Sequence, residues 1–180
     1  MGTWVCLLRG VNVGSHNRVS MPVLREALTA AGFVDVRSYV QSGNVIARSP
    51  HRSPAGVADA VSAVIQQHFG LDVPVVVRTP EHLRRVLAWD PFPDVSGSEP
   101  KRVAVVHLMG TPDPDRVARV LAEDVAPDAL AVRGEEAVVR YGANMHSSRI
   151  TGDWLARRLG VDGTARNWRT LGELVAMTSE

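Results

Sequence analysis

The chain has 180 residues, of which 45% are hydrophobic and 22% charged, and its formal net charge is +1 at pH 7. This length fits one domain or two small domains packed together, and the composition is that of a globular protein with a substantial core. The near-zero charge excludes a global electrostatic attraction to nucleic acid or to a membrane, so any basic site must be local.

The first half of the chain is predicted to form a strand, a helix, two strands, a helix and a strand. Short apolar or alternating runs indicate the strands, and the two middle strands flank a glycine-containing turn typical of a hairpin. Ser20 and Ser53 are candidate helix N-caps, and Gly32 and Gly70 are candidate helix ends. In chain order, the expected elements cover residues 4–8, 20–32, 34–40, 45–48, 53–69 and 73–77.

The same order of elements recurs in the second half. A connecting helix and a segment with three prolines and one glycine, the best candidate for a linker, come before it. The expected elements cover residues 81–88, 103–109, 115–123, 130–132, 137–141, 148–159, 163–166 and 170–177. This pattern predicts an α+β fold of two ferredoxin-like (βαββαβ) units packed together, plus a connecting helix and a C-terminal helix. The predicted boundaries are 1–89 for the first unit with its connecting helix, 90–102 for the linker and 103–180 for the second unit.

Three short polar segments adjoin predicted strands. They span residues 9–14 (RGVNVG), 41–44 (QSGN) and 164–170 (TARNWRT). Two of them contain arginine and none contains a carboxylate, a composition that favours binding of an anion. Gly10 and Gly14 permit close backbone approach, so N–H groups of the first loop could cradle such an anion.

The predicted topology brings these segments together in two places. In a βαββαβ unit, the end of the first strand and the hairpin after the second strand share one edge of the sheet, so residues 9–17 should lie beside residues 41–44. In the second unit, the ends of the third and fourth strands should share the opposite edge. That edge would group the side chains of Tyr141, Asn144, His146, Ser147, Asn167 and Arg169.

The polar segments also carry a family resemblance. Residues 7–14 (LLRGVNVG), 20–25 (SMPVLR), 39–45 (YVQSGNV) and 164–170 (TARNWRT), together with Asn17, resemble the signature of a bacterial family catalogued as domain of unknown function 1697. The resemblance covers nearly the whole chain. It implies a duplicated ferredoxin-like fold, and it implies no activity, ligand or catalytic residue.

The candidate ligand-binding residues share an amide, hydroxyl or guanidinium group in these segments. They are Arg9, Asn12, Asn17, Arg18, Gln41, Ser42, Asn44, Arg166 and Asn167. Each has a competing structural interpretation, because Asn, Ser and Gly also stabilise turns and Asn167 is a candidate cap for the last helix. Trp168 suits either the core or a stacking surface for a base.

Residues suited to catalysis are few. Cys6 lies within an apolar strand and is expected to be a core residue, and Ser147 has no Asp partner that its spacing identifies. His, Cys and Asp residues show no metal-ligand spacing, so no metal or cofactor is expected and no catalytic residue is assigned.

The function predicted from these residues is binding of a phosphate-bearing ligand, either a nucleotide or nucleic acid. A small-molecule enzyme with a site between the two units and a protein-interaction domain remain alternatives. With one cysteine, no long apolar run and no signal peptide, the chain is expected to be cytoplasmic and not to associate with a membrane. Its oligomeric state is left open.

Overall fold

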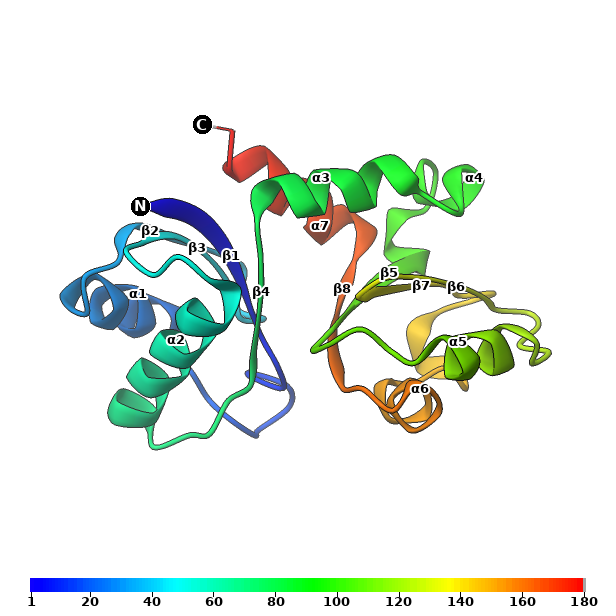
Figure 1. Ribbon diagram of the computed structural model, residues 1–180, viewed down its shortest axis with the longest axis horizontal. Helices are drawn as coiled ribbons and strands as arrows, with labels where there is room; N and C mark the ends of the chain where they lie inside the picture. Colours follow the sequence, from blue (N-terminus) through cyan, green and yellow to red (C-terminus); the bar gives the residue numbers. More distant parts are fainter. Residues whose placement is uncertain (180) are drawn as a thin grey trace. The chain divides into compact units, whose positions relative to one another are not determined.

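The computed structural model describes residues 1–179, which form seven α-helices and two four-stranded antiparallel sheets (Figure 1). The predicted α+β class is therefore confirmed. The chain divides into two compact units, residues 1–84 with the C-terminal segment from Leu174, and residues 85–173. The divisions fall inside α3 (Pro80–Trp89) and inside α7 (Trp168–Met177).

The first unit contains one sheet with the strand order β2-β3-β1-β4. Its elements are β1 (Gly2–Leu8), α1 (Met21–Ala30), β2 (Val34–Tyr39), β3 (Asn44–Ser49), α2 (Pro54–Phe69) and β4 (Val75–Arg78). Helices α1 and α2 lie on one face of this sheet (Figure 1). Trp4, Cys6 and Leu8 alternate along β1 and join the apolar sides of both helices in one core, because successive strand residues point to opposite faces.

Helix α2 shows how local sequence sets the element boundaries. Ser53 Oγ accepts a hydrogen bond from the N–H of Gly56 at 3.1 Å, and Pro54 occupies the first helical position. Gly70 adopts a left-handed conformation with φ of +67° immediately after the last helical residue. Both ends agree with the sequence prediction, since they depend on capping residues within a few positions of the helix.

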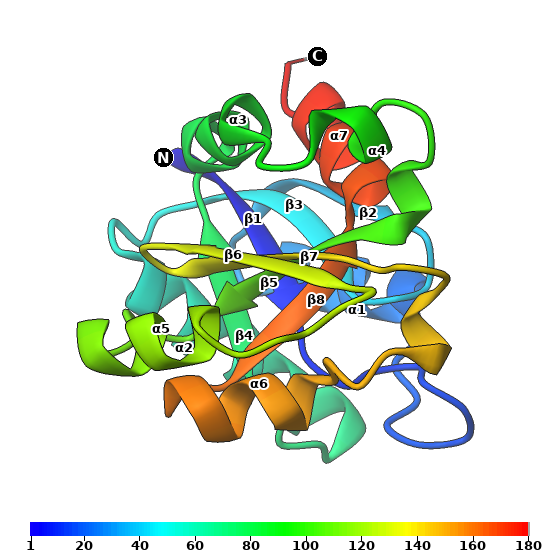
Figure 2. The same cartoon turned by 90° about the vertical axis from the view of Figure 1, so that its right-hand side faces the viewer.

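The second unit contains a sheet with the order β6-β7-β5-β8. Its strands and 3-10 turns are η1 (Pro100–Arg102), β5 (Val103–Leu108), β6 (Ala129–Arg133), β7 (Glu136–Arg140), η2 (Met145–Ser147) and β8 (Gly163–Asn167). Its further helices are α4 (Pro93–Ser96), α5 (Pro114–Leu121) and α6 (Gly152–Leu159). Helices α5 and α6 lie on the same side of the sheet (Figure 2) and bury the alternating residues Ala104, Val106 and Leu108.

Some predicted boundaries in the second unit are wrong. The helix predicted over 148–159 begins at Gly152, because Thr151 is its cap and accepts the N–H of Trp154 at 3.1 Å. Ser148 instead donates to Asp128 Oδ2 at 2.6 Å. Residues 90–102 contain α4 and η1, and their role as a linker stays a prediction.

Gly43 in the β2–β3 hairpin is the glycine with the tightest surroundings in the first unit. Its φ is +80°, and a Cβ at this position would lie 2.5 Å from Val11 Cγ2 and 2.7 Å from Leu8 Cβ. Gly14 has a similar φ of +58°, but an added Cβ there would meet nothing within 4 Å. Substitutions at Gly43 and Gly14 therefore distinguish the cost of steric overlap from the cost of backbone strain.

We expect Gly43→Ala to lower the free energy of unfolding by about 2–4 kcal/mol, because backbone strain and steric overlap add. Gly14→Ala should cost only about 1 kcal/mol, from the strain of its positive φ. Urea denaturation of both variants measures the difference. Equal losses would show that Val11 and Leu8 move aside without penalty.

Candidate ligand-binding surface

The polar loop after β1 and the β2–β3 hairpin adjoin in the first unit. The N–H of Leu8 donates to the carbonyl of Gly43 at 2.8 Å, and Asn12 Nδ2 donates to the carbonyl of Gln41 at 2.6 Å. Residues 9–18 and 40–44 therefore form one continuous surface, called here the loop surface. The sequence predicted this proximity from the shared sheet edge.

Asn12 connects the parts of this surface. In addition to its bond to Gln41, its Nδ2 donates to the carbonyl of Val19 at 2.8 Å and its Oδ1 accepts from the N–H of Val19 at 2.9 Å. Its φ is +54°, a conformation that Asn tolerates better than most residues. The Asn12 amide thus connects the end of the loop at Val19 with the hairpin at Gln41.

The side-chain amides of Asn17 and Asn44 also donate hydrogen bonds to neighbouring residues. Asn17 Nδ2 donates to the carbonyl of Gly10 at 3.1 Å, and its own carbonyl accepts the N–H of Asn12 at 3.0 Å. Asn44 is fully buried, and its Nδ2 donates to the carbonyl of Tyr39 at 3.1 Å and to Ser42 Oγ at 3.0 Å. These two predicted ligand-binding residues contribute to the turns themselves.

The exposed side chains of the loop surface are basic or neutral. His16, Arg18, Gln41 and Ser42 are exposed, whereas Arg9 is half-buried. Within residues 1–179, the side chain of Arg18 makes no hydrogen bond or ion pair. Neither segment of the loop surface contains Asp or Glu, so no carboxylate of its own competes for the guanidinium of Arg18.

The other two predicted residues, Arg166 and Asn167, belong to the second unit. Arg166 is 8% exposed, and its Nη1 donates to Thr164 Oγ1 at 2.9 Å and to the carbonyl of Ala165 at 2.8 Å. Burial lowers the pKa of the Arg166 guanidinium to about 10, so the group stays charged at neutral pH. Asn167 Oδ1 accepts the N–H of Thr170 at 2.8 Å, as expected of a helix cap.

The second polar cluster predicted from the sequence is less closely joined. Strands β7 and β8 both end beside the start of β5, where Arg140 pairs with Val103 and Asn167 with Ala104. Asn144 uses its Oδ1 to accept the N–H groups of His146 and Ser147 at 2.9 and 3.1 Å. Over residues 1–179, no hydrogen bond or ion pair connects this turn with Asn167 or Arg169.

A buried polar pair in the second sheet was missed by the sequence analysis. His107 and Glu136 face each other on β5 and β7, and His107 Nδ1 lies 3.5 Å from Glu136 Oε1. Both are buried, and Thr164 pairs with His107 from β8. The available signal was His107 within an apolar run; Glu136 lies just before the strand predicted over 137–141, and only the strand register shows that the two meet.

Cys6 is a core residue, as expected, and Trp168, for which the sequence left the core and a stacking surface open, is buried in the core. Cys6 is 1% exposed and burial raises the pKa of its thiol to about 12. Trp168 is 9% exposed. Residues 1–179 contain no group of three or more His, Cys, Asp or Glu side chains placed to hold a metal ion. No helix in this range is both long and apolar enough to cross a membrane.

A family model described as a protein of unknown function (DUF1697) matches residues 1–137 of the chain. The chain belongs to this family. The resemblance inferred from its motifs is therefore confirmed. A comparison with curated proteins finds no match.

A solved structure shares the fold of this DUF1697 chain. The conserved bacterial protein SP0830 from Streptococcus pneumoniae matches with a TM-score of 0.74 and 23% sequence identity, covering 100% of this chain and 99% of that chain. At this identity the similarity establishes the fold alone.

Replacing Asn12 should destabilise the first unit. Asn12→Ala removes three hydrogen bonds and leaves backbone groups of Val19 and Gln41 unsatisfied, so we expect a loss of about 2–3 kcal/mol in the free energy of unfolding. Gln41→Ala is the matched control, because the Gln41 side chain is exposed and only its backbone carbonyl accepts the bond. Chemical denaturation compares the two, and a comparable loss in both variants would contradict this role for Asn12.

The single cysteine reports on opening of the core. Because the Cys6 thiol is buried and its pKa is raised to about 12, we expect iodoacetamide at about pH 8 to leave the native protein unmodified, since only an accessible thiolate reacts. The same reagent should add one group per chain in urea. Mass spectrometry measures both, and rapid modification without denaturant would contradict the burial of this strand.

Proposed function

We propose that the loop surface binds a phosphate-bearing anion, as the recognition element of a nucleotide- or nucleic-acid-binding protein. The observation that carries this proposal is the exposed Arg18, which has no intramolecular partner in residues 1–179 and lies on a surface without carboxylates. A guanidinium offers paired N–H groups that match the oxygens of a phosphate.

The rigidity of the loop supports this proposal. Because Asn12 and Asn17 already bond the backbone, binding a ligand would not require ordering of the chain around Arg18. A pre-organised loop loses less conformational entropy on binding than a flexible one. The exposed Gln41 side chain adds a neutral donor on the adjoining hairpin, suited to a ribose hydroxyl or to a further phosphate oxygen.

Two broader features belong to the same proposal. We propose that each unit is ferredoxin-like, because its strands and main helices follow the order strand, helix, strand, strand, helix, strand and the first strand is central in both sheets. We also propose that the protein acts in the cytoplasm, where a single reduced cysteine is the ordinary state.

Removing the Arg18 guanidinium should weaken phosphate binding without affecting the fold. We expect Arg18→Gln to raise the dissociation constant by about tenfold or more, since a charge-assisted hydrogen bond contributes ~1.5–3 kcal/mol. The panel consists of inorganic phosphate, nucleoside mono- and triphosphates, sugar phosphates and short single-stranded oligonucleotides, measured by calorimetry. Thermal unfolding without ligand should match that of the parent.

Arg119→Gln is the charge-matched control. Arg119 is exposed on α5 of the second unit and its side chain has no partner in residues 1–179, so this variant has the same net charge without altering the loop surface. Equal weakening by both variants would indicate non-specific attraction, and no binding of any probe by the parent would reject the proposal. A steep salt dependence with oligonucleotides alone would identify nucleic acid as the ligand.

A further inference from the structure

The second unit contains a small pocket between its sheet and α6. The pocket has a volume of about 250 Å³. Val106, Val139 and Ala165 line it from the sheet, and Ile150, Leu155 and Met145 line it from α6 and the turn before it. All of these residues belong to one compact unit, so the pocket is separate from the loop surface of the first unit.

The pocket is open because the helical layer leaves part of the sheet uncovered. Ala165 lies on the same face as the buried Val106, with which it pairs, yet it is exposed. Met145 is 51% exposed at the edge of the pocket. Its flexible thioether side chain can adapt to an occupant, as methionines at binding surfaces do.

Tyr141 and Thr151 are the two residues with a polar side chain in the lining, and Thr151 Oγ1 already accepts the N–H of Trp154 as the helix cap. Tyr141 is 3% exposed, and among residues 1–179 no group forms a hydrogen bond with its hydroxyl. Burial, followed by the nearby Asp128 charge, raises the pKa of the Tyr141 phenol to about 12. The phenol therefore stays protonated and remains a hydrogen-bond donor throughout the physiological pH range. The fully buried side-chain atoms without a partner in residues 1–179 do not include this hydroxyl oxygen, so the oxygen keeps some contact with solvent and can be reached by a ligand.

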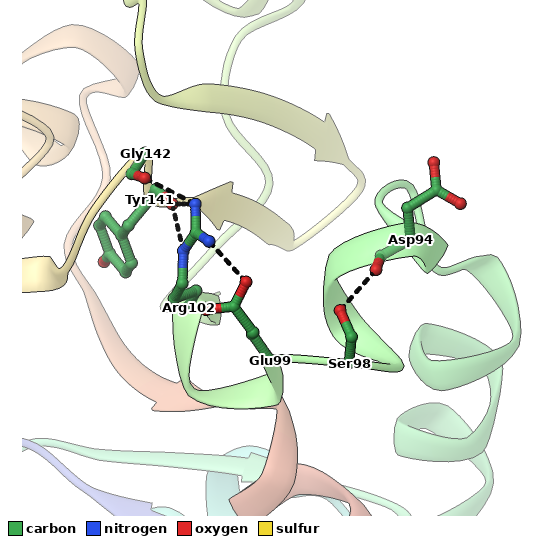
Figure 3. A network of polar contacts seen from close by, with 6 residues as sticks. All are labelled: Asp94, Ser98, Glu99, Arg102, Tyr141 and Gly142. Carbon is green, nitrogen blue, oxygen red and sulfur yellow. Dashed lines mark hydrogen bonds and ion pairs between the residues drawn. The ribbon is translucent and has the colours of Figure 1, made fainter.

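The backbone that carries Tyr141 is held firmly. Arg102 donates from Nε and Nη2 to the Tyr141 carbonyl at 3.2 and 3.1 Å and from Nη2 to the Gly142 carbonyl at 2.6 Å (Figure 3). Glu99 Oε1 accepts from Arg102 Nη1 at 2.7 Å. The Tyr141 side chain extends away from this network (Figure 3). The backbone position of Tyr141 is thus set before any ligand arrives.

The adjoining turn is fixed on its other side by Asp128. Its Oδ1 accepts the N–H of Gly142 at 2.8 Å and its Oδ2 accepts Ser148 Oγ at 2.6 Å. A Cβ on Gly142 would lie 2.7 Å from Pro127, so this close approach requires glycine. Such a supported side chain has the geometry expected of a pre-organised binding group.

We infer that this pocket binds a small neutral molecule with an apolar ring and one carbonyl, whose oxygen accepts a hydrogen bond from the Tyr141 hydroxyl. The apolar wall favours a hydrocarbon ring, and none of the residues that line the pocket is charged. The Asp128 carboxylate disfavours an anionic ligand near the phenol. The volume exceeds the ~150 Å³ cavity that accepts benzene and so suits a substituted monocyclic ring.

Three related compounds test this chemistry on the full chain. Acetophenone has the ring and the carbonyl, ethylbenzene lacks the carbonyl and benzoate is charged. The readout is the NMR shift of the Met145 methyl group in protein with labelled methionine methyls, with the fully buried Met21 of the first unit as an internal reference. We expect saturable shifts at Met145 with acetophenone, weaker binding of ethylbenzene and none with benzoate.

Two variants separate the hydroxyl from the cavity. Tyr141→Phe keeps the ring and should weaken acetophenone binding by about three- to tenfold while leaving ethylbenzene unchanged, since one neutral hydrogen bond is lost. Ala165→Phe should fill the pocket and abolish binding of both. If Ala165→Phe fails to fold, Gly152→Val is the alternative obstruction, because an added Cβ there meets nothing within 4 Å and the backbone is unstrained.

Three results would overturn the assignment of this pocket. Absence of a Met145 shift with acetophenone excludes the pocket as a site for this class of ligand. Equal weakening of acetophenone and ethylbenzene by Tyr141→Phe excludes the hydroxyl as the donor. Tighter binding of benzoate than of acetophenone reverses the assigned charge preference. Because the pocket and the loop surface lie in different units, none of these results depends on the Arg18 experiment.

Discussion

The position of β1 in the middle of its sheet is the constraint on which the first unit depends. This strand pairs with β3 on one side and with β4 on the other, and every residue from Trp4 to Leu8 is buried. A strand of this kind cannot shift by one residue without turning its core side chains to the other face. The chain must therefore leave the sheet at Arg9, where the register places the β2–β3 hairpin next to it.

This fixed exit explains why the loop surface consists of turns held by amides. The N–H of Leu8 continues the pairing onto Gly43, and the absence of a side chain at Gly43 lets Val11 approach. Asn12 then bonds the loop to the hairpin. The result is a rigid and carboxylate-free surface in which asparagine supplies the structure, while Arg18 and Gln41 remain at the solvent.

The second unit applies the same plan with different side chains. Strand β5 lies between β7 and β8, and the turn after β7 is held by Arg102 and Asp128 in addition to Asn144. Because α6 begins only at Gly152, the helical layer leaves Ala165 uncovered beside the buried Tyr141. The pocket is a consequence of where this helix begins, and its polar group is a consequence of how the turn is supported.

Local sequence by itself determined the order of the elements, the α+β class, the caps at Ser53 and Gly70, and the family. These follow from capping and periodicity over a few residues, and from motifs such as LLRGVNVG. The proximity of the first loop and the QSGN hairpin was also predictable, since strand order alone decides which ends share an edge. The core position of Cys6 followed from its apolar neighbours.

The tertiary structure alone decided whether the loop amides bond the backbone or face a ligand. An asparagine in a loop has the same local signature whether it bonds the backbone or faces a ligand, and only the contacts of Asn12 and Asn44 show that their amides are used internally. Similarly, the burial of Arg166, the meeting of His107 with Glu136 and the pocket beside Tyr141 depend on strand register and on where a helix covers a sheet. These contacts join residues distant in the chain, so no local pattern encodes them.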